Sequence, residues 1–566
     1  MNELNGYQVT IIIAVLFIAV TAYTMIRENA KAKRRLDARI RNSWGTVPTR
    51  EYTYEEFASI SNYIWDQKTT DFVIDDITWN DLEMDRIYQL INQTMCSCGE
   101  VVLYSMLRKP VFNQNELNER ERLMKYFHDN PEKRIELQRV LAQIGKPVGM
   151  SIWDYVQALD DVVDTKKQKK HIISCVAGII SVCSLLLNPV IGVILLVTVL
   201  AYNFWDYFRE KGSIEIYLKS FQCVLRLLKS CDALCKLDLP QIKEYQDTIA
   251  QKKKSLQKFR RGSFVVITTG MVSTGIADAI LDFFKMFLHV DLIKFYSMIG
   301  EVQSKKKEIQ ELVECVGWLD SMIAVSSFRC CLPHYAIPVF KEDVQPAIHV
   351  EELYHPFIEN PVSNSLDTRR SVLLTGSNAS GKSTFLKNIA LNSLLAQTTN
   401  TCVAKAYEAP FFKIMTSMAL RDDLSGGESY YMVEIRSLKR IFDEAQKEVP
   451  ILCIIDEVLR GTNTIERISA SSSALRTLSE KNVLVFAATH DIELTYLLEQ
   501  AYDNYHFKEI MSETDIQFPY KLYSGRSNTR NAIQLLKMIG FPDNVTQTAT
   551  KQAEDFEKTG KWEVLC

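Results

Sequence analysis

The sequence predicts an α plus α/β protein with three parts: a membrane anchor, a long all-α region and a C-terminal domain built on a parallel sheet. Residues 8–26 form an uncharged apolar run, and residues 213–345 have the apolar spacing of helices. From about residue 346, short apolar strands alternate with helical stretches, which is typical of a parallel α/β sheet. At 566 residues, the chain is too long for one hydrophobic core.

The composition bears on whether the protein binds nucleic acid, an anionic membrane or a metal ion. The formal net charge is −3, so the chain as a whole has no basic field that would attract nucleic acid or an anionic membrane. A local basic surface is still compatible with that total. The 13 cysteines lack the paired spacing of a zinc site, and we interpret them as reduced, mostly buried thiols of a cytosolic protein. The presence of only eight histidines argues further against a metal enzyme.

Residues 8–26 are about as long as a bilayer span. Basic residues follow this run, and none precedes it: Arg27, Lys31, Lys33, Arg34, Arg35, Arg39 and Arg41. The positive-inside rule then places the N-terminus outside and everything after residue 27 in the cytoplasm. A cleaved signal peptide is the alternative, but signal peptides carry their positive charge before the apolar core. We therefore expect residues 1–43 to anchor the protein in the cell membrane through an N-terminal span and a basic juxtamembrane segment.

A second apolar region, residues 172–205, is longer than one span and is interrupted by the turn signal Asn188-Pro189. Each half is slightly short for a span. Both flanks are basic, with Lys166, Lys167, Lys169 and Lys170 before the region and Arg209 and Lys211 after it. We expect residues 166–212 to form a membrane hairpin that enters and leaves on the cytoplasmic face. A buried helical hairpin of a soluble domain is the alternative.

Helical segments are predicted on both sides of this hairpin, in residues 44–165 and 213–345, and they would form one all-α domain. Lys252–Lys254 and Lys305–Lys307 are basic clusters within it. Each is most simply a solvated helix face, and a contact with a phosphate backbone is the alternative. We interpret the apolar but partly polar stretch Phe264–Leu281 as a buried core helix rather than a further span.

A glycine-rich loop lies near the start of the C-terminal domain. It follows the apolar run 371–374 and precedes a helical stretch, which is the order that a phosphate-binding loop of the form Gly376-x-x-x-x-Gly381-Lys382-Ser383 requires. Its backbone N–H groups and the helix N-terminus would face a phosphate. The predicted ATP-binding residues are Gly376, Ser377, Asn378, Ala379, Ser380, Gly381, Lys382, Ser383 and Thr384. Lys382 would contact the β and γ phosphates, and the Ser383 hydroxyl would ligate Mg²⁺.

Two further groups follow apolar strands. Asp456 and Glu457 come directly after the buried run 451–455, and the predicted roles are Mg²⁺ binding for Asp456 and general base for Glu457. Such an acidic pair can also be a simple helix N-cap, but its position after a phosphate-binding loop favours catalysis. His490 follows the strand 483–488 and would sense the γ-phosphate, although an isolated histidine is more often structural.

The stretch Leu424–Ser429 resembles the signature loop of ABC-type ATPases. That resemblance implies that Ser425, Gly426, Gly427 and Ser429 act in trans, completing the γ-phosphate site of a second subunit. A homodimer with composite ATP sites is therefore expected.

The match then narrows to one branch of that superfamily. The run Asp422–Ile435, the segment Asp456–Thr464, and His355-Pro356 resemble motifs of the MutS family of DNA mismatch-repair proteins. Tail residues resemble the family's helical dimerisation element: Tyr523, Gly525, Asn531, Ala532, Gly540 and Pro542. The resemblance implies a P-loop ATPase domain over residues 346–520 and a dimerisation element over 521–566. More weakly, Thr94, Gly99, Leu107, Pro110, Arg120 and Leu312–Ser326 resemble the core and lever of that family.

The sequence departs from the family in two respects. Too few residues lie between the first apolar run and the lever-like region to form the family's mismatch-reading domain, and its connector domain is missing as well. The stretch Phe507-Lys-Glu509 resembles the family's mismatch-reading Phe-x-Glu motif but lies in the wrong part of the chain. The family's usual Pro and Gly in the phosphate loop are replaced by Ser377 and Ala379, which leaves ATP binding expected.

Two functions are compatible with this pattern. One is an ATP-driven clamp, tethered to the membrane, that binds DNA without mismatch specificity. The other is a mechanochemical membrane ATPase that acts on a protein or membrane partner without DNA. Family resemblance favours the first, while the net charge and the missing reader domain favour the second.

Overall fold

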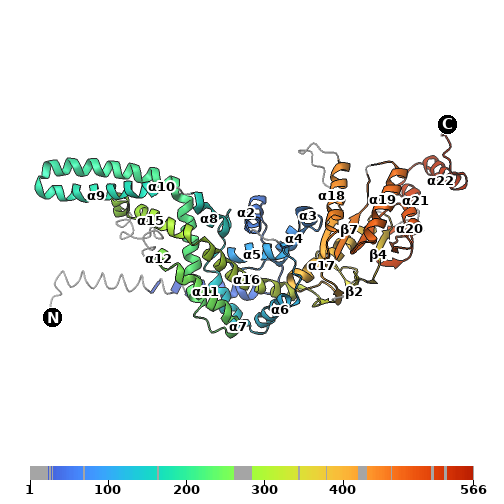
Figure 1. Cartoon of the computed structure of the whole chain (residues 1–566), viewed down its shortest axis with the longest axis horizontal. Helices are drawn as coiled ribbons and strands as arrows, with labels where there is room; N and C mark the ends of the chain where they lie inside the picture. The colour runs from blue at the N-terminus through green and yellow to red at the C-terminus, as the bar shows by residue number, and fades with distance from the viewer. Residues whose placement is uncertain are drawn as a thin grey trace, which may run out of the picture. The chain divides into compact units, whose positions relative to one another are not determined.

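The computed structural model describes residues 23–24, 27–28, 30–67, 71–161, 165–260, 283–341, 345–377, 379–418, 430–460, 462–511, 516–527 and 532–564. The chain divides into two compact units (Figure 1). Unit 1 comprises Met1–Thr69, Tyr88–Ser105 and Glu121–Cys331; unit 2 comprises Thr70–Ile87, Met106–Arg120 and Leu332–Cys566. Most of the predicted span 8–26 and all of Phe264–Leu281 lie outside the described residues, so both stay predictions.

The described part of unit 1 consists of helices joined by turns and loops and contains no β-strand, as the sequence predicts, and a helical stretch at residues 30–43 precedes its labelled helices. Its helices are α2 (Tyr54–Trp65), α7 (Pro131–Leu141), α8 (Ile152–Gln157), α9 (Thr165–Leu187), α10 (Pro189–Leu234), α11 (Lys243–Ser255), α12 (Gln257–Arg260), α15 (Val290–Ser304) and α16 (Lys306–Cys331), with short 3-10 turns at Ala158–Asp161 and Pro240–Ile242. The chain passes between the units within α4 (Met84–Ile91), α5 (Ser97–Arg108) and α6 (Gln114–Asp129).

Helices α5 and α16 cross closely because each has a glycine at the crossing: Gly99 in α5 and Gly317 in α16. A Cβ at Gly317 would lie 2.3 Å from the carbonyl oxygen of Cys98, and a Cβ at Gly99 would lie 2.3 Å from Oδ2 of Asp320. The Asp320 carboxylate accepts hydrogen bonds from the backbone N–H groups of Met95, at 2.9 Å, and Cys96, at 3.0 Å. Two stretches that resemble one family's core and lever thus meet inside unit 1.

The predicted hairpin is present as α9 and α10, which lie side by side (Figure 1). The turn falls at Asn188, whose side chain accepts from the N–H groups of Val190 and Ile191, with Pro189 at the first position of α10. The apolar segments Lys167–Leu187 and Pro189–Gly212 have 21 and 24 residues, longer than the sequence estimate, and are long and apolar enough to cross a membrane. Only 22% of an apolar 18-residue window in each segment is buried, whereas a core helix would be mostly buried.

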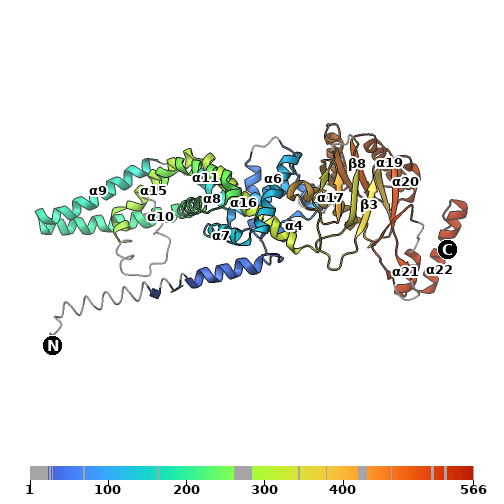
Figure 2. The ribbon, with the colours of Figure 1, turned by 90° about the horizontal axis from the view of Figure 1, so that it is seen from below.

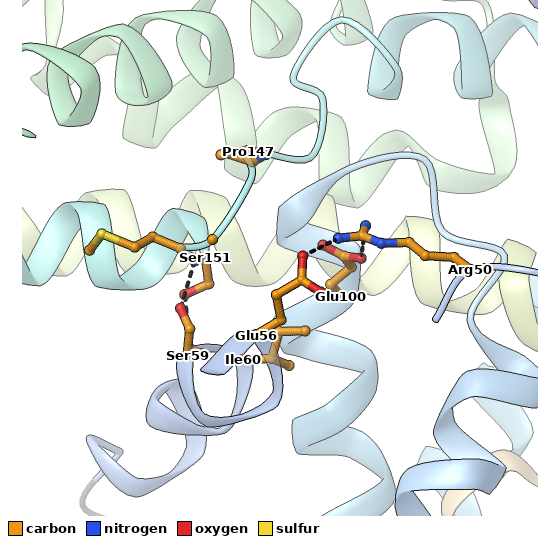
Figure 3. Close-up of a pocket in the computed structure, with 9 residues that line it drawn as sticks. Arg50, Glu56, Ser59, Ile60, Glu100, Pro147 and Ser151 are labelled. Carbon is orange, nitrogen blue, oxygen red and sulfur yellow. Dashed lines mark hydrogen bonds and ion pairs between the residues drawn. The ribbon is translucent and has the colours of Figure 1, made fainter. Parts of the chain in front are cut away.

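A small cavity lies where the loop before α8 meets α2 (Figure 3). Arg50 bridges Glu56 and Glu100 at 3.0 and 2.9 Å, and the Ser151 N–H donates to Ser59 Oγ at 2.7 Å. The cavity measures about 10 Å³, which is room for about one water molecule. Hydrogen bonds and ion pairs connect these segments of unit 1, and the cavity between them is too small for a ligand larger than water.

Unit 2 contains a six-stranded sheet in its described part, in the order β12-β9-β4-β8-β7-β6. The strands are β6 (Lys413–Ser417), β7 (Ile451–Asp456), β8 (Val483–Ala488), β4 (Ser371–Thr375), β9 (Tyr502–Phe507) and β12 (Leu522–Ser524). All neighbours are parallel except β12 with β9, so the predicted parallel sheet is confirmed. A second sheet, β1-β5-β2-β3, consists of Val339–Phe340, Ala406–Ala409, Ile348–Leu353 and Asn364–Thr368, and β10 (Ile510–Met511) pairs with β11 (Ile516–Gln517).

Helices cover both faces of the larger sheet. Side chains of α18 (Tyr430–Glu444), α19 (Thr464–Ser479) and α20 (Ile492–Leu497) share a buried core with alternate residues of β7 and β8. Figure 2 shows α17 (Lys382–Thr399) on one side of the sheet and α19 and α20 on the other. The central strands are buried on both faces, which explains their unbroken apolar sequence.

Several segments lie elsewhere than the predicted domain boundaries put them, among them Met106–Arg120, which belongs to unit 2 although it falls in the predicted all-α range 44–165. The short helix α3 (Asp76–Asp81), within the predicted all-α range 44–165, belongs to unit 2, because Asp81 accepts hydrogen bonds from Thr416 Oγ1 and the Met418 N–H at 2.6 and 3.0 Å. Residues 339–340, expected to be helical, form β1. The range 521–566 begins with strand β12, so its helical part starts only at α21 (Ala532–Ile539), followed by α22 (Asp543–Thr559).

Candidate nucleotide-binding site

The predicted phosphate loop connects β4 to α17. Gly376 has a φ of 141°, and a Cβ there would lie 2.5 Å from the carbonyl oxygen of Phe507, so only glycine fits without a shift. Gly381 has a φ of 107° at the N-cap of α17. Ala379 adopts a φ of 64°, a strained value for a residue with a Cβ. The loop therefore has the tight, irregular backbone that a phosphate cradle needs; Asn378 lies outside the described residues.

Lys382 folds back over this loop. Its Nζ donates to the carbonyl oxygens of Gly376 and Ser377, each at 2.8 Å. Burial lowers the pKa of Lys382, and the carboxylates of Asp456 and Glu457 oppose that shift. The ammonium is thus held at the loop by weak neutral acceptors, which phosphate oxygens can replace. Ser383 and Thr384 are exposed at the start of α17, and Ser380 is buried.

Three strand ends bring the predicted residues to one edge of the sheet. Leu374 of β4 pairs with Ala488 of β8, which in turn pairs with Asp456 of β7. The strand ends are tied further by a hydrogen bond of 3.0 Å from the Thr489 N–H to the Leu374 carbonyl. The loop, the acidic pair and His490 thus leave adjacent parallel strands at the same level, the edge where open α/β sheets bind ligands.

Glu457 lies at the centre of this group. His490 Nε2 is 3.1 Å from its Oε1, and Arg460 forms an ion pair with its Oε2. Burial acts to raise the pKa of Glu457, but the hydrogen bond from His490 and the charge of Arg460 outweigh it, so that the pKa is lowered. Glu457 has a φ of 59°, a strained backbone of the kind found at functional sites. It is an ionised carboxylate with two partners on its two oxygens.

Asp456 is suited to a cation. Its Oδ1 is buried, and no group among the described residues donates a hydrogen bond to it. A buried carboxylate oxygen without a donor is costly unless a cation neutralises it. The orphaned oxygen therefore fits the Mg²⁺ predicted for Asp456, with the exposed Ser383 as the second candidate ligand.

Supporting residues were missed by the sequence analysis. Glu434 of α18 accepts the Leu459 N–H, Ser377 Oγ donates to Glu509 at 2.7 Å, and Arg467 contacts Asp491 at 2.6 and 2.9 Å, beside His490. Arg460 lies three residues after Glu457, so their ion pair is a local contact within the loop after β7. Glu434 was part of a recognised motif, but nothing in its spacing indicates that it contacts that loop. Only the folded chain brings these partners together.

The signature residues Ser425, Gly426, Gly427 and Ser429 lie outside the described residues, so their role in trans stays a prediction.

Comparison with known proteins agrees with the site. A family model described as MutS domain V matches residues 372–557. The chain is 31% identical over 269 residues to the DNA mismatch repair protein MutS of Thermotoga sp. (strain RQ2), covering 45% of this chain and 33% of that protein. It is 32% identical over 280 residues to MutS of Thermotoga neapolitana, covering 47% and 34%, and 31% identical over 268 residues to MutS of Natronomonas pharaonis, covering 45% and 30%. The chain thus matches about a third of the length of these relatives.

Proposed function

This chain is a MutS-like protein, and on that premise we propose that it is a membrane-tethered, homodimeric ATPase that closes around DNA when it binds ATP. One observation carries the ATPase part of the proposal. The glycine-rich loop, Asp456, Glu457 and His490 converge at the carboxyl ends of three adjacent parallel strands.

The chain's own residues divide the work of hydrolysis. Lys382 exchanges the carbonyls of the loop for phosphate oxygens, and Ser383 and Asp456 hold Mg²⁺, which when bound neutralises charge on the phosphates. Glu457, kept ionised by its neighbours, accepts the proton of the attacking water. His490 orients Glu457 and faces the terminal phosphate, so that it distinguishes ATP from ADP.

The homodimer is proposed from two features. The resemblance of Ser425–Ser429 to a signature loop implies a second subunit, because such a loop completes its partner's site. In the tail, α21 and α22 border an apolar cavity of about 700 Å³, which residues such as Ile533, Val545 and Trp562 line. Exposed apolar surface of this kind is typical of association sites.

Membrane tethering is proposed from the hairpin α9–α10. Many of its apolar side chains face outward, among them Leu186, Leu187, Val190 and Ile194, which are at least 63% exposed. Such a surface is costly in water and favourable in a bilayer. With the expected anchor at 8–26, the ATPase domain would lie in the cytoplasm.

The DNA-binding part of the proposal rests on the likeness to the MutS relatives. Lys252 and Lys253 form ion pairs with Glu311 and Asp232, which reduces the positive charge they offer to phosphates. Lys254 is exposed. Any contact of this cluster with DNA therefore has to compete with existing carboxylates.

The experiment is ATP hydrolysis by the full-length, detergent-purified protein with and without duplex DNA, together with DNA binding across a salt series. We expect stimulated hydrolysis and an affinity that falls with salt and weakens when Lys252, Lys253 and Lys254 are changed to Gln. No stimulation and no binding at low salt would overturn the clamp, and the ATP-driven motion would then act on a membrane or protein partner. Absence of hydrolysis under all conditions would instead overturn the ATPase.

A further inference from the structure

Three buried side chains of the types that bind metal ions cluster in unit 1, which contains none of the motifs of the nucleotide site. His171 is in the first part of α9, Asp206 is in α10, and His289 is the residue before α15. None of the three side chains has measurable exposure. Their ligand atoms all lie within 4.8 Å of one another.

The two imidazoles face each other with their nitrogens. Nδ1 of His171 lies 3.0 Å from Nδ1 of His289, and 3.9 Å from Oδ2 of Asp206. Two imidazole nitrogens bound to one zinc ion at about 2.0–2.1 Å in a tetrahedral site would be about 3.3 Å apart. The observed pair is therefore within a few tenths of an ångström of the spacing that a shared metal ion requires.

The surroundings fix which nitrogen of His289 is available. Its Nε2 lies 2.9 Å from the backbone carbonyl oxygen of Asn203, and because a carbonyl only accepts, Nε2 carries the proton. The neutral ring then has its lone pair on Nδ1, which points to His171. A carbonyl that holds the far nitrogen of a histidine is the usual second partner in metal sites. The His171 ring is held differently, stacked on Tyr296 at 5.6 Å.

Asp206 supplies the observation that a histidine pair alone does not explain. Its Oδ1 accepts from Lys170, and Arg209 lies 3.8 Å from the same atom. Its buried Oδ2, on the side of His171, accepts no hydrogen bond from the described residues. A proton shared between the two imidazoles would satisfy their Nδ1 atoms but would leave Oδ2 of Asp206 buried without a donor. One cation among the three atoms satisfies all of them.

We propose that His171, Asp206 and His289 bind one divalent transition-metal ion of the zinc type at the base of the α9–α10 hairpin. Two imidazoles and one carboxylate form a donor set that such ions prefer, with water able to complete the coordination. The neighbouring charges are compatible, since Lys167 pairs with Glu210 and Lys170 with Asp206. The ion would join α9, α10 and the start of α15, three elements whose ligands lie up to 118 residues apart.

The test uses the full-length protein in detergent, stripped with a chelator and titrated with Co²⁺ or Zn²⁺ alone. We expect one equivalent of Zn²⁺ per chain to remain after gel filtration, and a Co²⁺ spectrum without a thiolate charge-transfer band. Asp206→Asn and His289→Gln should weaken binding at least tenfold. The matched control is His349→Gln, since His349 also lies 3.4 and 3.7 Å from two carboxylates but is partly exposed. This control should bind as the unchanged protein does.

A substitution that exchanges one ligand for another separates loss of the site from loss of the fold. His171→Cys should keep the metal and add a thiolate-to-Co²⁺ charge-transfer band, which no misfolded chain would show. Failure of the unchanged protein to retain metal overturns the proposal, as does retention that the Asp206 and His289 variants do not weaken. A His171→Cys protein that binds Co²⁺ without the new band overturns it as well.

Discussion

The nucleotide site of unit 2 and the histidine cluster of unit 1 are built in opposite ways. In unit 2, the functional side chains follow three strands whose parallel register puts their ends side by side, so that strand pairing brings them to one edge of the sheet. In unit 1, His171, Asp206 and His289 meet only because three helices pack together. The first kind of site leaves a motif in the sequence, and the second kind leaves none.

The largest effect is expected for ATP hydrolysis at the nucleotide site of unit 2, where Glu457 follows strand β7. Glu457→Gln removes the proton acceptor while keeping the size of the side chain, so ATP turnover should fall about 10²–10⁴-fold. ATP should still bind and trap the dimer closed. Steady-state hydrolysis and nucleotide binding measure this. The control is Glu480→Gln on the exposed end of α19, and an unchanged rate in the Glu457 variant would remove it as the base.

The next effect concerns a buried charge in the helical unit. Burial raises the pKa of Asp320 from 3.8 to about 6, despite its hydrogen bonds from Met95 and Cys96. Because the folded state holds the proton more tightly, this contribution to stability is complete below pH 3.8 and is lost as the pH rises through 6. We expect the loss of this contribution to lower the free energy of unfolding by about 2 kcal/mol between pH 4.5 and 7. Thermal unfolding at both pH values measures the change.

If Asp320 causes this pH dependence, Asp320→Asn should make the free energy of unfolding nearly the same at pH 4.5 and pH 7. The control is Asp238→Asn, a carboxyl of the same unit that is 92% exposed, and it should leave the profile unchanged. An Asp320 variant with the full pH dependence would show that other groups cause it.

A smaller effect tests the backbone of the phosphate loop. Gly376→Ala adds a Cβ that collides with the Phe507 carbonyl, whereas Gly525→Ala, at a φ of 92°, meets no described atom within 4 Å. Both substitutions strain the backbone, so their difference isolates the collision. We expect ATP affinity to fall roughly 30-fold in the first, or about 2 kcal/mol, and little in the second. Equal losses in a nucleotide-binding titration would mean that conformation, and not space, selects glycine.

The smallest effect uses two natural cysteines of unit 1. Cys183, in the hairpin, and Cys330, near the end of α16, are both exposed. In membranes, a polar maleimide should label Cys330 at least about tenfold faster, because a thiol in the bilayer stays protonated and shielded. In detergent-free denaturant the two rates should converge. Equal rates in membranes would favour the soluble hairpin instead.

Sequence reasoning reached the sheet, the hairpin turn and the order of the phosphate loop, the acidic pair and His490. Those features depend on local patterns: apolar strands, Asn188-Pro189, and glycines at a strand-to-helix turn. Side-chain contacts between residues that are distant in the sequence could not be predicted from it. Asp81 accepts a hydrogen bond from Thr416, and Glu434 accepts one from the Leu459 N–H, and no spacing indicates either contact. The low histidine count argued against metal, although two of the eight histidines face each other in the core.

The helix α10 continues without interruption through 46 residues, from the tip of the hairpin to the middle of unit 1. At 1.5 Å per residue it is about 69 Å long. Its first half is the second apolar segment, and its second half packs within the helical unit. A single α-helix transmits twist and tilt stiffly, because bending it breaks backbone hydrogen bonds. On the proposed membrane placement of the hairpin, a rotation of the helical unit would pass to it as torque along this one stiff helix, without crossing a flexible joint.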